Sequence, residues 1–342
     1  MEKVNLYYHK IKEIGQDGAN STTFLCKDNQ LGAVVVVKEI SRLSINNTVD
    51  DYHKESKILY AHRHPNICEI QWGAECDKNI YLAMPYYKNG SLKNLLDNKI
   101  LTVKEIIKYS LDILNGLQYI HSRRLLHLDI KPTNILINNS NRALLTDFGL
   151  SKMLQDGKDI ATIDSVYFSH LVPDVIDGVP IADVKYDIYQ FGLTLYRMCN
   201  GNIHFKNQIP SARELLKSQI KNGTFPDRTS FRISITKKIK NIVKKCLHID
   251  RTKRYNSVIE IMNDLSKIEK GLEWKLSNNM LSLDQNNHTI KIELINNNNT
   301  FSTIGKKINK ETLRETRINK YNKIFTTENE RNKFIESILE EF

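Results

Sequence analysis

The stretch HLDIKPTNIL, from His127 to Leu136, contains side chains that could act on a phosphate group. Its carboxylate, ammonium group and amide follow one another as Asp129, Lys131 and Asn134, in the pattern H-x-D-[LI]-x-x-x-N. A second carboxylate follows in the sequence Asp147-Phe148-Gly149, after the strand-like stretch RALLT. Phosphoryl transfer needs little covalent help and depends on groups that position phosphates and neutralise charge. These residue types therefore favour that chemistry.

Four further motifs surround this segment in a fixed order. VVVK ends at Lys38, and HKESKIL contains Glu55; further along, YDIYQFGL contains Asp187 and HIDRTKRY contains Arg254. Each motif alone is a weak signal, since a lysine on a strand is usually solvated and a single aspartate can be a turn residue. The order and spacing of the whole set are specific. From about residue 8 to residue 270, the chain resembles the eukaryotic-like Ser/Thr protein kinases.

The resemblance implies a role for each catalytic residue. Asp129 would accept or orient the proton of the acceptor hydroxyl, and Lys131 would hold the γ-phosphate of ATP. Asn134 and Asp147 would supply oxygen ligands to Mg²⁺, which prefers hard oxygen donors. Lys38 would bind the α- and β-phosphates.

Three structural partnerships are implied by the same resemblance. Lys38 would pair with Glu55 on the first helix. Asp187 would support the catalytic loop, and Arg254 would pair with an acid of the A-P-E motif. That motif is present here as VPD, so the acid would be Asp174.

The stretch YLAMPYY resembles the hinge that binds adenine. Met84 would close the back of the pocket, Pro85 would contribute its carbonyl, and Tyr87 would donate its N–H; a proline at that position lacks only the N–H. The residues expected to bind ATP are Ile14, Gly15, Gly18, Ser21, Thr23, Val36, Lys38, Met84, Pro85, Tyr87 and Leu136.

The loop IGQDGANSTTFL departs from the glycine-rich pattern of the family. Without an insertion, Asp17 and Asn20 replace the second and third glycines; with one extra residue, Gly18 and Ser21 take those places. We prefer the second alignment, because it retains one more glycine. Glycine permits a positive φ and a close backbone approach, and asparagine tolerates left-handed geometry better than most residues. We expect a moderate loss of nucleotide affinity and no loss of binding.

Leu128 replaces the arginine that usually precedes the catalytic aspartate in the family. That arginine grips a phosphorylated activation loop. Its absence predicts an activity that does not depend on phosphorylation of Thr162 or Ser165.

The pattern of hydrophobic residues predicts an α+β protein with a bilobal protein-kinase-like fold. Strand-like runs separated by Gly, Asp and Asn turns fill a small lobe at 8–87, with one helix expected over 49–63. Amphipathic runs fill a larger helical lobe at 88–270, and the first has a capping box of Thr102 and Glu105.

Residues 271–342 are expected to form a small α+β accessory module. Alternating residues around Asn-rich turns predict two or three strands in its first part. The stretch NKETLRETRINKYNKIF, residues 309–325, is interpreted as a helix. The last stretch is interpreted as a second helix, with a capping box of Thr327 and Glu330.

The composition indicates the cellular location of the protein and the kinds of partner that it binds. The formal charge of +11 over 342 residues favours acidic or phosphorylated partners. The basic run TKKIKNIVKKCL, residues 236–247, is interpreted as the solvated face of an amphipathic helix, and nucleic acid is not an expected partner. Five cysteines without a C-x-x-C pair, no signal peptide and no long apolar segment predict a cytoplasmic protein that does not enter a membrane.

Three functions are compatible with these motifs. The first is a Ser/Thr protein kinase with a role in signalling. It uses ATP and Mg²⁺ and phosphorylates protein hydroxyls and itself. Self-association is compatible with this function. The second is a pseudokinase that binds nucleotide and acts as a scaffold through residues 271–342. The third is phosphotransfer to a small molecule. The intact set of Lys38, Asp129, Asn134 and Asp147 favours the first. The Asn-, Lys- and Ile-rich composition favours an AT-rich, bacterial genome.

Overall fold

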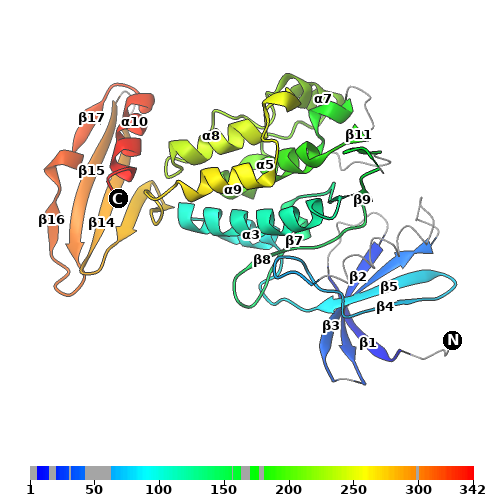
Figure 1. The fold of residues 1–342 in the computed structure, drawn as a ribbon. Coiled ribbons are helices and arrows are strands. Elements are labelled where there is room, and N and C mark those ends of the chain that lie inside the picture. Colours follow the sequence, from blue (N-terminus) through cyan, green and yellow to red (C-terminus); the bar gives the residue numbers. More distant parts are fainter. Residues whose placement is uncertain are drawn as a thin grey trace. The chain divides into compact units, whose positions relative to one another are not determined.

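The computed structural model describes two compact units of the chain (Figure 1). The first contains residues 1–95, 115–166 and 181–183, and the second contains residues 96–114, 167–180 and 184–342. Within them, the residues whose structure is described are 6–14, 21–30, 32–42, 63–155, 157–162, 170–176, 181–297 and 300–342. No helix in these ranges combines the length and the apolar character needed to cross a membrane.

A five-stranded antiparallel sheet opens the first unit. Its strands are β1 (Tyr8–Glu13), β2 (Ser21–Asp28), β3 (Val34–Ser41), β4 (Trp72–Glu75) and β5 (Asn79–Pro85), in the order β1-β2-β3-β5-β4. The β-branched residues of β3 alternate between faces, and Val35 and Val37 pack with Cys26 and Ala83 in a small core. The strands predicted here are confirmed. The helix predicted over 49–63 lies almost wholly outside the described residues.

Short elements complete the first unit. A two-residue strand, β6 (Leu125–Leu126), leads into the loop at 127–131 and a 3₁₀ turn, η2 (Pro132–Asn134). The strands β7 (Ile135–Ile137) and β8 (Ala143–Leu145) then form a hairpin. Further pairs join β6 to β9 (Lys152–Met153) and β10 (Ala161–Thr162) to β11 (Ile181–Ala182). Most side chains of the β7–β8 hairpin are buried, and β8 leads directly into the segment that contains Asp147.

Helices dominate the first part of the second unit. They are α4 (Pro173–Ile176), α5 (Val184–Asn200), α6 (Asn202–Lys206), α7 (Arg213–Asn222), α8 (Lys237–Cys246) and α9 (Val258–Ser266), with the 3₁₀ turn η4 (Arg251–Lys253). The helices α2 (Leu92–Asn98) and α3 (Val103–His121) run across the boundary between the units. The predicted capping box begins α3, since the Thr102 N–H donates to Glu105 Oε2 at 3.0 Å and the Glu105 N–H donates to Thr102 Oγ1 at 3.3 Å.

Helices α5 and α8 pack closely. A Cβ on Gly192 of α5 would lie 2.7 Å from the Cβ of Cys246, so this contact requires glycine. The basic run at 236–247 forms α8 as predicted. Its apolar side, Ile239, Ile242, Val243 and Leu247, is buried, while most of its lysines are exposed.

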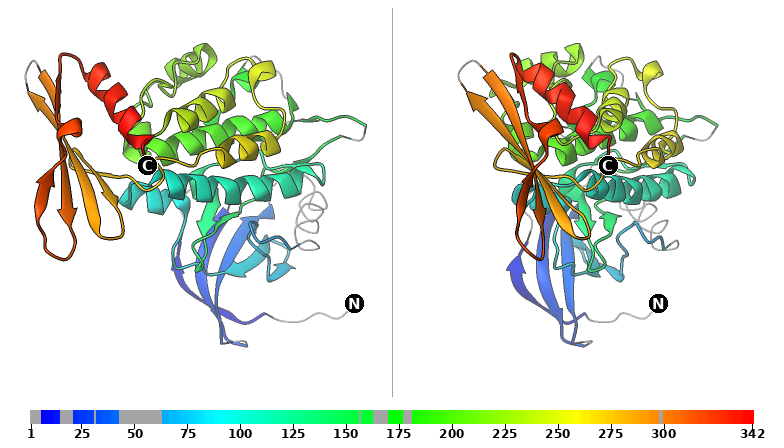
Figure 2. Two further views of the ribbon diagram at one scale, coloured as in Figure 1. Left: turned by 60° about the vertical axis from the view of Figure 1, so that its left-hand side comes forward. Right: turned by 90° about the vertical axis from the view of Figure 1, so that its left-hand side faces the viewer.

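The second unit ends in a six-stranded antiparallel sheet and one helix. The strands are β12 (Lys275–Ser277), β13 (Met280–Asp284), β14 (His288–Asn297), β15 (Thr300–Asn309), β16 (Glu315–Arg317) and β17 (Lys323–Phe325), where β16 and β17 both pair with β15. Helix α10 (Glu328–Leu339) covers one face (Figures 1 and 2). Its capping box of Thr327 and Glu330 is present as predicted.

The helix predicted over 309–325 is wrong. This segment contains a turn, β16, a 3₁₀ turn η5 (Asn319–Tyr321) and β17. Asn309 accepts the N–H groups of Glu311 and Thr312 at 2.9 and 2.8 Å, and Leu313 has a φ of 56°. Both features favour a turn, and pairing with β15 outweighs the helix propensity of the Lys- and Glu-rich sequence.

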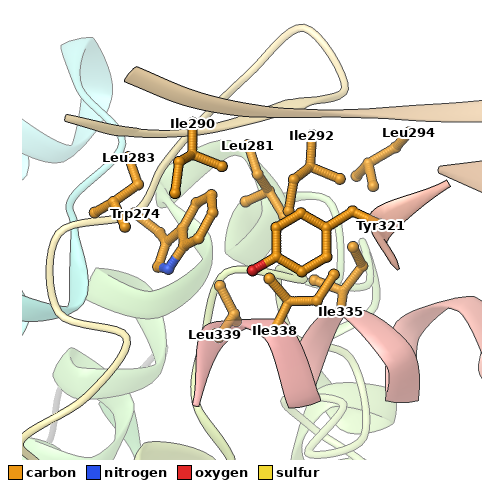
Figure 3. Close-up of a cluster of buried hydrophobic side chains, with 10 residues drawn as sticks. All are labelled: Trp274, Leu281, Leu283, Ile290, Ile292, Leu294, Tyr321, Ile335, Ile338 and Leu339. Atoms are coloured by element: carbon orange, nitrogen blue, oxygen red, sulfur yellow. The ribbon is translucent and has the colours of Figure 1, made fainter. Parts of the chain in front are cut away.

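The core of this last part lies between the sheet and α10, as Figure 3 shows. It contains Trp274, Leu281, Leu283, Ile290, Ile292, Leu294, Tyr321, Ile335, Ile338 and Leu339. The part also contacts helices of the same unit, because the Lys104 N–H donates to Leu272 O at 2.8 Å and Lys240 pairs with Glu336 at 2.5 Å. Residues 271–342 are therefore packed against the helices and are more than a tethered tail. The α+β class is confirmed.

Candidate active site

The loop after β6 gathers three of the predicted catalytic residues. Asp129, Lys131 and Asn134 are all buried. The Asn134 amide donates to the backbone carbonyl of Asp129 at 3.0 Å and to its Oδ2 at 2.7 Å. Lys131 Nζ lies 2.8 Å from the same Oδ2. One oxygen of the Asp129 carboxylate is thus held by two donors.

The other carboxylate oxygen of Asp129 is different. Oδ1 is buried and has no hydrogen-bond partner among the described residues. A buried oxygen without a donor is unfavourable unless something else binds it. The preceding residue, Leu128, has a φ of 63°, which is uncommon for a branched side chain and marks a constrained backbone at this point. The loop therefore holds Asp129 rigidly and leaves one acceptor open.

Asp147 follows β8 and is paired with Lys38 from β3. Its φ of 62° turns the chain sharply after the strand. Burial opposes ionisation of Asp147, but the Lys38 ammonium, with smaller contributions from His127 and Lys131, outweighs it and keeps the pKa of this carboxyl below its usual value. Asp147 is therefore a carboxylate at neutral pH.

His127 packs beside Phe148, as the sequence predicted. The ring centroids are 4.7 Å apart, and His127 Nε2 lies 3.2 Å from the carbonyl oxygen of Thr146. Because the ring is fully buried and bound to backbone, it serves to join the two loops that carry Asp129 and Asp147.

A cavity of about 660 Å³ lies within the first unit and includes most of the predicted nucleotide-binding residues. The volume is within the range that holds a small-molecule ligand. The predicted residues that line it are Ile14, Ser21, Thr23, Val36, Lys38, Met84, Pro85, Tyr87, Lys131, Asn134, Leu136 and Asp147. Asp129 is adjacent through Lys131 and Asn134 and is not part of the lining.

Three predicted site residues cannot be placed. Gly15, Gly18 and Glu55 lie outside the described residues, so neither alignment of the glycine loop is tested, nor is the predicted pair of Lys38 with Glu55. In the described part of the chain, Lys38 is paired with Asp147.

The cavity also has lining residues that the motifs did not indicate. They include Cys68, Leu82, Ser91 and Thr146. Burial raises the pKa of the Cys68 thiol to about 12, so it remains a neutral wall group. Thr146 could have been found, since it directly precedes Asp147, whereas Cys68 belongs to an irregular segment whose position depends on the fold.

The second unit contains the predicted pair of Arg254 and Asp174. Arg254 Nη2 donates to Asp174 Oδ2 at 2.7 Å, and its side chain is only 1% exposed. Arg254 also donates to the carbonyl oxygens of His248 and Ile249, at 2.7 and 3.1 Å. Asp187, in the first turn of α5, is fully buried.

Comparison with known proteins gives consistent matches. The family model described as protein kinase domain matches residues 8–265. The "Probable serine/threonine-protein kinase PknB" of Lactococcus lactis subsp. lactis is 28% identical over 265 residues, which are 76% of this chain and 41% of that protein. The "Serine/threonine-protein kinase VIK" of Arabidopsis thaliana is 29% identical over 252 residues, 70% of this chain and 56% of that protein. The chain thus spans less than two thirds of the length of these relatives.

Proposed function

The chain belongs to the protein kinase family, and we propose that it is a protein-serine/threonine kinase that transfers the γ-phosphate of ATP to protein hydroxyls, its own included. Its fold is the bilobal kinase fold followed by a β-rich region. We assign the kinase domain to residues 8–270 and an accessory domain to residues 271–342. The relatives named above carry the same activity in their names.

One observation carries this proposal. Asp129 is held by Asn134 and Lys131, which line a cavity together with Lys38 and Asp147, while its buried Oδ1 has no hydrogen-bond partner among the described residues. A hydroxyl group that donates to Oδ1 would satisfy this buried oxygen and would be oriented for attack. As the bond from the hydroxyl oxygen to the γ-phosphorus forms, the bond from that phosphorus to the β,γ-bridging oxygen breaks and ADP leaves, while the hydroxyl proton passes to this carboxylate.

Lys131 and Lys38 would neutralise negative charge on the phosphates. Lys131 is buried beside Asp129, so its ammonium group can stabilise negative charge that develops on the transferred phosphoryl group. Lys38 projects from β3 into the cavity and is only 14% exposed. Its position fits the α- and β-phosphates of the bound nucleotide.

The chemistry of the donor set fits Mg²⁺. Asn134 and Asp147 both line the cavity and offer an amide oxygen and an ionised carboxylate, which are hard oxygen donors. When bound there, Mg²⁺ would neutralise phosphate charge. The adenine ring would contact Met84 and the carbonyl of Pro85, at the end of β5, and the N–H of Tyr87, two residues after that strand.

A phosphotransfer assay tests the proposal. The full chain is incubated with radiolabelled ATP, Mg²⁺ and a generic basic protein, and labelled Ser and Thr are identified after hydrolysis. Asp129→Asn should reduce transfer by roughly 100- to 10,000-fold while nucleotide binding persists. Lys38→Ala should weaken transfer, whereas Lys27→Ala, an exposed lysine on β2, should leave it unchanged. A wild-type chain that binds ATP and transfers no phosphate would overturn the proposal in favour of a scaffold.

We also propose that activity does not require phosphorylation of the activation segment. The buried, apolar Leu128 offers no side-chain donor to a phosphate group. The chain with Thr162→Ala and Ser165→Ala should therefore retain its activity, and loss of activity in this variant would count against the idea. A cytoplasmic location and a role in signalling remain predictions; the five cysteines, all free, are consistent with a reducing compartment.

A further inference from the structure

The C-terminal sheet has two unlike faces. One face carries Leu281, Leu283, Ile290, Ile292 and Leu294, which are buried beneath α10. In the views of Figures 1 and 2, α10 lies on this face, and no other described element of the second unit lies on the opposite face. Successive side chains of a strand alternate between faces. The residues between the buried positions therefore form an outer face.

Four cations lie in one row across this outer face. The register places Lys275 opposite Ser282, Ser282 opposite Lys291, Lys291 opposite Lys306, and Lys306 opposite Arg317. We call Lys275, Lys291, Lys306 and Arg317 the basic row. Like charges directly opposite on neighbouring strands destabilise a sheet. The basic row therefore lowers the stability of the sheet, and the needs of folding do not explain it.

Only part of the row is neutralised within the sheet. Lys275 pairs with Asp284 and Lys306 pairs with Glu315, each at 2.9 Å. Lys291 and Arg317 form no ion pair with any residue in the described ranges. Two cations of the row, Lys291 and Arg317 on either side of Lys306, are therefore available to an anionic partner.

An aliphatic patch borders the basic row. The register places Met280 opposite Glu293 and Glu293 opposite Ile304, while Ser302 lies between Ile295 and Ile324. Diagonal neighbours in a sheet are close enough for long side chains to touch. We call Met280, Ile295, Ile304 and Ile324 the aliphatic patch, and Ile324 is 78% exposed. The solvated face of an antiparallel sheet is usually polar, so this patch is unusual.

We propose that the outer face is a docking surface for an acidic segment of a partner protein, with aliphatic side chains beside its carboxylates. The segment's carboxylates pair with Lys291 and Arg317, and its aliphatic side chains cover the patch. Charge pairs of this kind direct association and register, while apolar burial supplies most of the affinity. The proposal goes beyond phosphotransfer and does not depend on it.

The acids on the outer face argue for a protein partner. Glu293 lies in the middle of the aliphatic patch, and insertion of the patch into a lipid surface would bury that carboxylate. Asp284 and Glu315 already pair with Lys275 and Lys306, so among the described residues the row has two unpaired cations, too few to neutralise the continuous phosphates of a nucleic acid. The outward positions of the described strands named above carry no aromatic ring on which bases could stack.

The size of the surface sets the length of the segment. Neighbouring strands are about 4.8 Å apart, so a row over five strands extends about 19 Å. An extended chain rises about 3.3 Å per residue, so roughly six residues would cross the row. A short linear segment is therefore sufficient as a probe.

Fluorescence anisotropy with a labelled peptide tests the docking surface. The probe has about ten residues that alternate Glu and Ile, and the control peptide has Gln in place of Glu. The full chain should bind the Glu peptide more tightly than the Gln peptide, and added salt should weaken binding. Lys291→Glu with Arg317→Glu should weaken it about tenfold. Ile324→Asp should also weaken it.

A matched variant controls for net charge. Lys237→Glu with Lys253→Glu makes the same charge change at exposed positions on α8 and η4, and should leave the affinity unchanged. The Lys291→Glu/Arg317→Glu chain should unfold at the same temperature as wild type or higher, because a repulsion is removed.

Three results would overturn the proposal. The first is failure of the wild-type chain to bind the Glu peptide, and the second is an equal loss of affinity in the matched variant. The third is tighter binding of another probe through Lys291 and Arg317, whether phosphatidylserine vesicles, single-stranded oligothymidylate or, by sedimentation, a second copy of the chain. That outcome would assign the surface to a different occupant.

Discussion

The Asn134 side-chain amide donates to both the backbone carbonyl and the carboxylate of Asp129, at 3.0 and 2.7 Å. These two bonds fix the position of the loop and the rotamer of the carboxylate at once. Lys131 binds the same oxygen, so Oδ1 is the acceptor that remains open. Asn134 therefore positions Asp129 as well as offering an oxygen to the cavity.

Replacement of Asn134 by Ala should lower kcat by roughly 100-fold, the loss expected when a reacting group moves by about 1 Å. The measurement is steady-state phosphotransfer at several Mg²⁺ concentrations, with Asn89→Ala, an exposed asparagine of the same unit, as control. A loss that excess Mg²⁺ does not restore is expected from mispositioned Asp129. Full restoration by Mg²⁺ would show that the two bonds to Asp129 contribute nothing to activity.

The ion pair of Lys38 and Asp147 should make stability depend on pH. Because the pair lowers the pKa of Asp147 in the folded state, its stabilising contribution is present above the unfolded pKa and is lost as pH falls through the folded pKa. The midpoint of thermal unfolding of wild type should exceed that of Lys38→Met at pH 7. The difference between the two unfolding midpoints should become smaller as the pH falls below about 4.

The matched comparison for this pair is Asp147→Asn, which removes the titrating group. Its unfolding midpoint should change less with pH between about 3 and 7 than that of wild type. A gap between wild type and Lys38→Met that stays constant over this range would contradict the proposed coupling.

Most of the fold could be predicted from the sequence because its signals are local. The alternating β-branched residues of β3 and the capping box at Thr102 each specify an element within a few residues. The helix prediction for residues 309–325 is wrong for the opposite reason. Their helix propensity is overridden by pairing with β15, a contact between segments that the pattern alone does not connect.

The same difference between local signals and contacts of distant segments applies to the candidate site. Motif spacing indicated the residues that the structure places around one cavity, from Ile14 to Asp147. It did not indicate that Lys38 pairs with Asp147 in this structure, nor that Cys68 lines the wall. Both depend on how the loops after β8 and before β4 approach the sheet, which is a property of tertiary packing.

Asp174 should be important for stability through Arg254. Asp174→Asn removes the charge partner of a guanidinium that is 1% exposed, so a buried cation is left without its anion. Loss of one partner of a buried pair costs about 3–5 kcal/mol. Urea unfolding of the full chain measures this change. Arg251→Ala removes the longer contact to the same carboxylate, 3.6 Å from a more exposed arginine, and should cost less than about 1 kcal/mol.

Equal effects of Asp174→Asn and Arg251→Ala would contradict this ranking. Asp174→Asn leaves the buried Arg254 without its anion, whereas Arg251→Ala leaves the pair of Arg254 and Asp174 in place. The comparison therefore separates the contribution of the buried pair from that of the exposed contact.

Gly305 of β15 should be intolerant of a side chain. A Cβ at this position would overlap the Cβ of Tyr321, which is part of the core under α10. The Tyr321 ring is held in turn by a bond from its hydroxyl to Glu341 at 2.6 Å, so it cannot move away freely. Gly305→Ala should destabilise the C-terminal part by about 1–3 kcal/mol, the usual effect of overpacking a core.

Tryptophan fluorescence reports on this part directly. The chain has two tryptophans, so in a Trp72→Phe background the signal comes from Trp274, which lies in the same core. Ser302→Ala, on the same strand but on the outer face, is the matched control and should change the unfolding midpoint little. If Gly305→Ala unfolds at the same urea concentration as the control, the Tyr321 side chain can move to accommodate the added Cβ. The core under α10 would then be less tightly packed than the structure indicates.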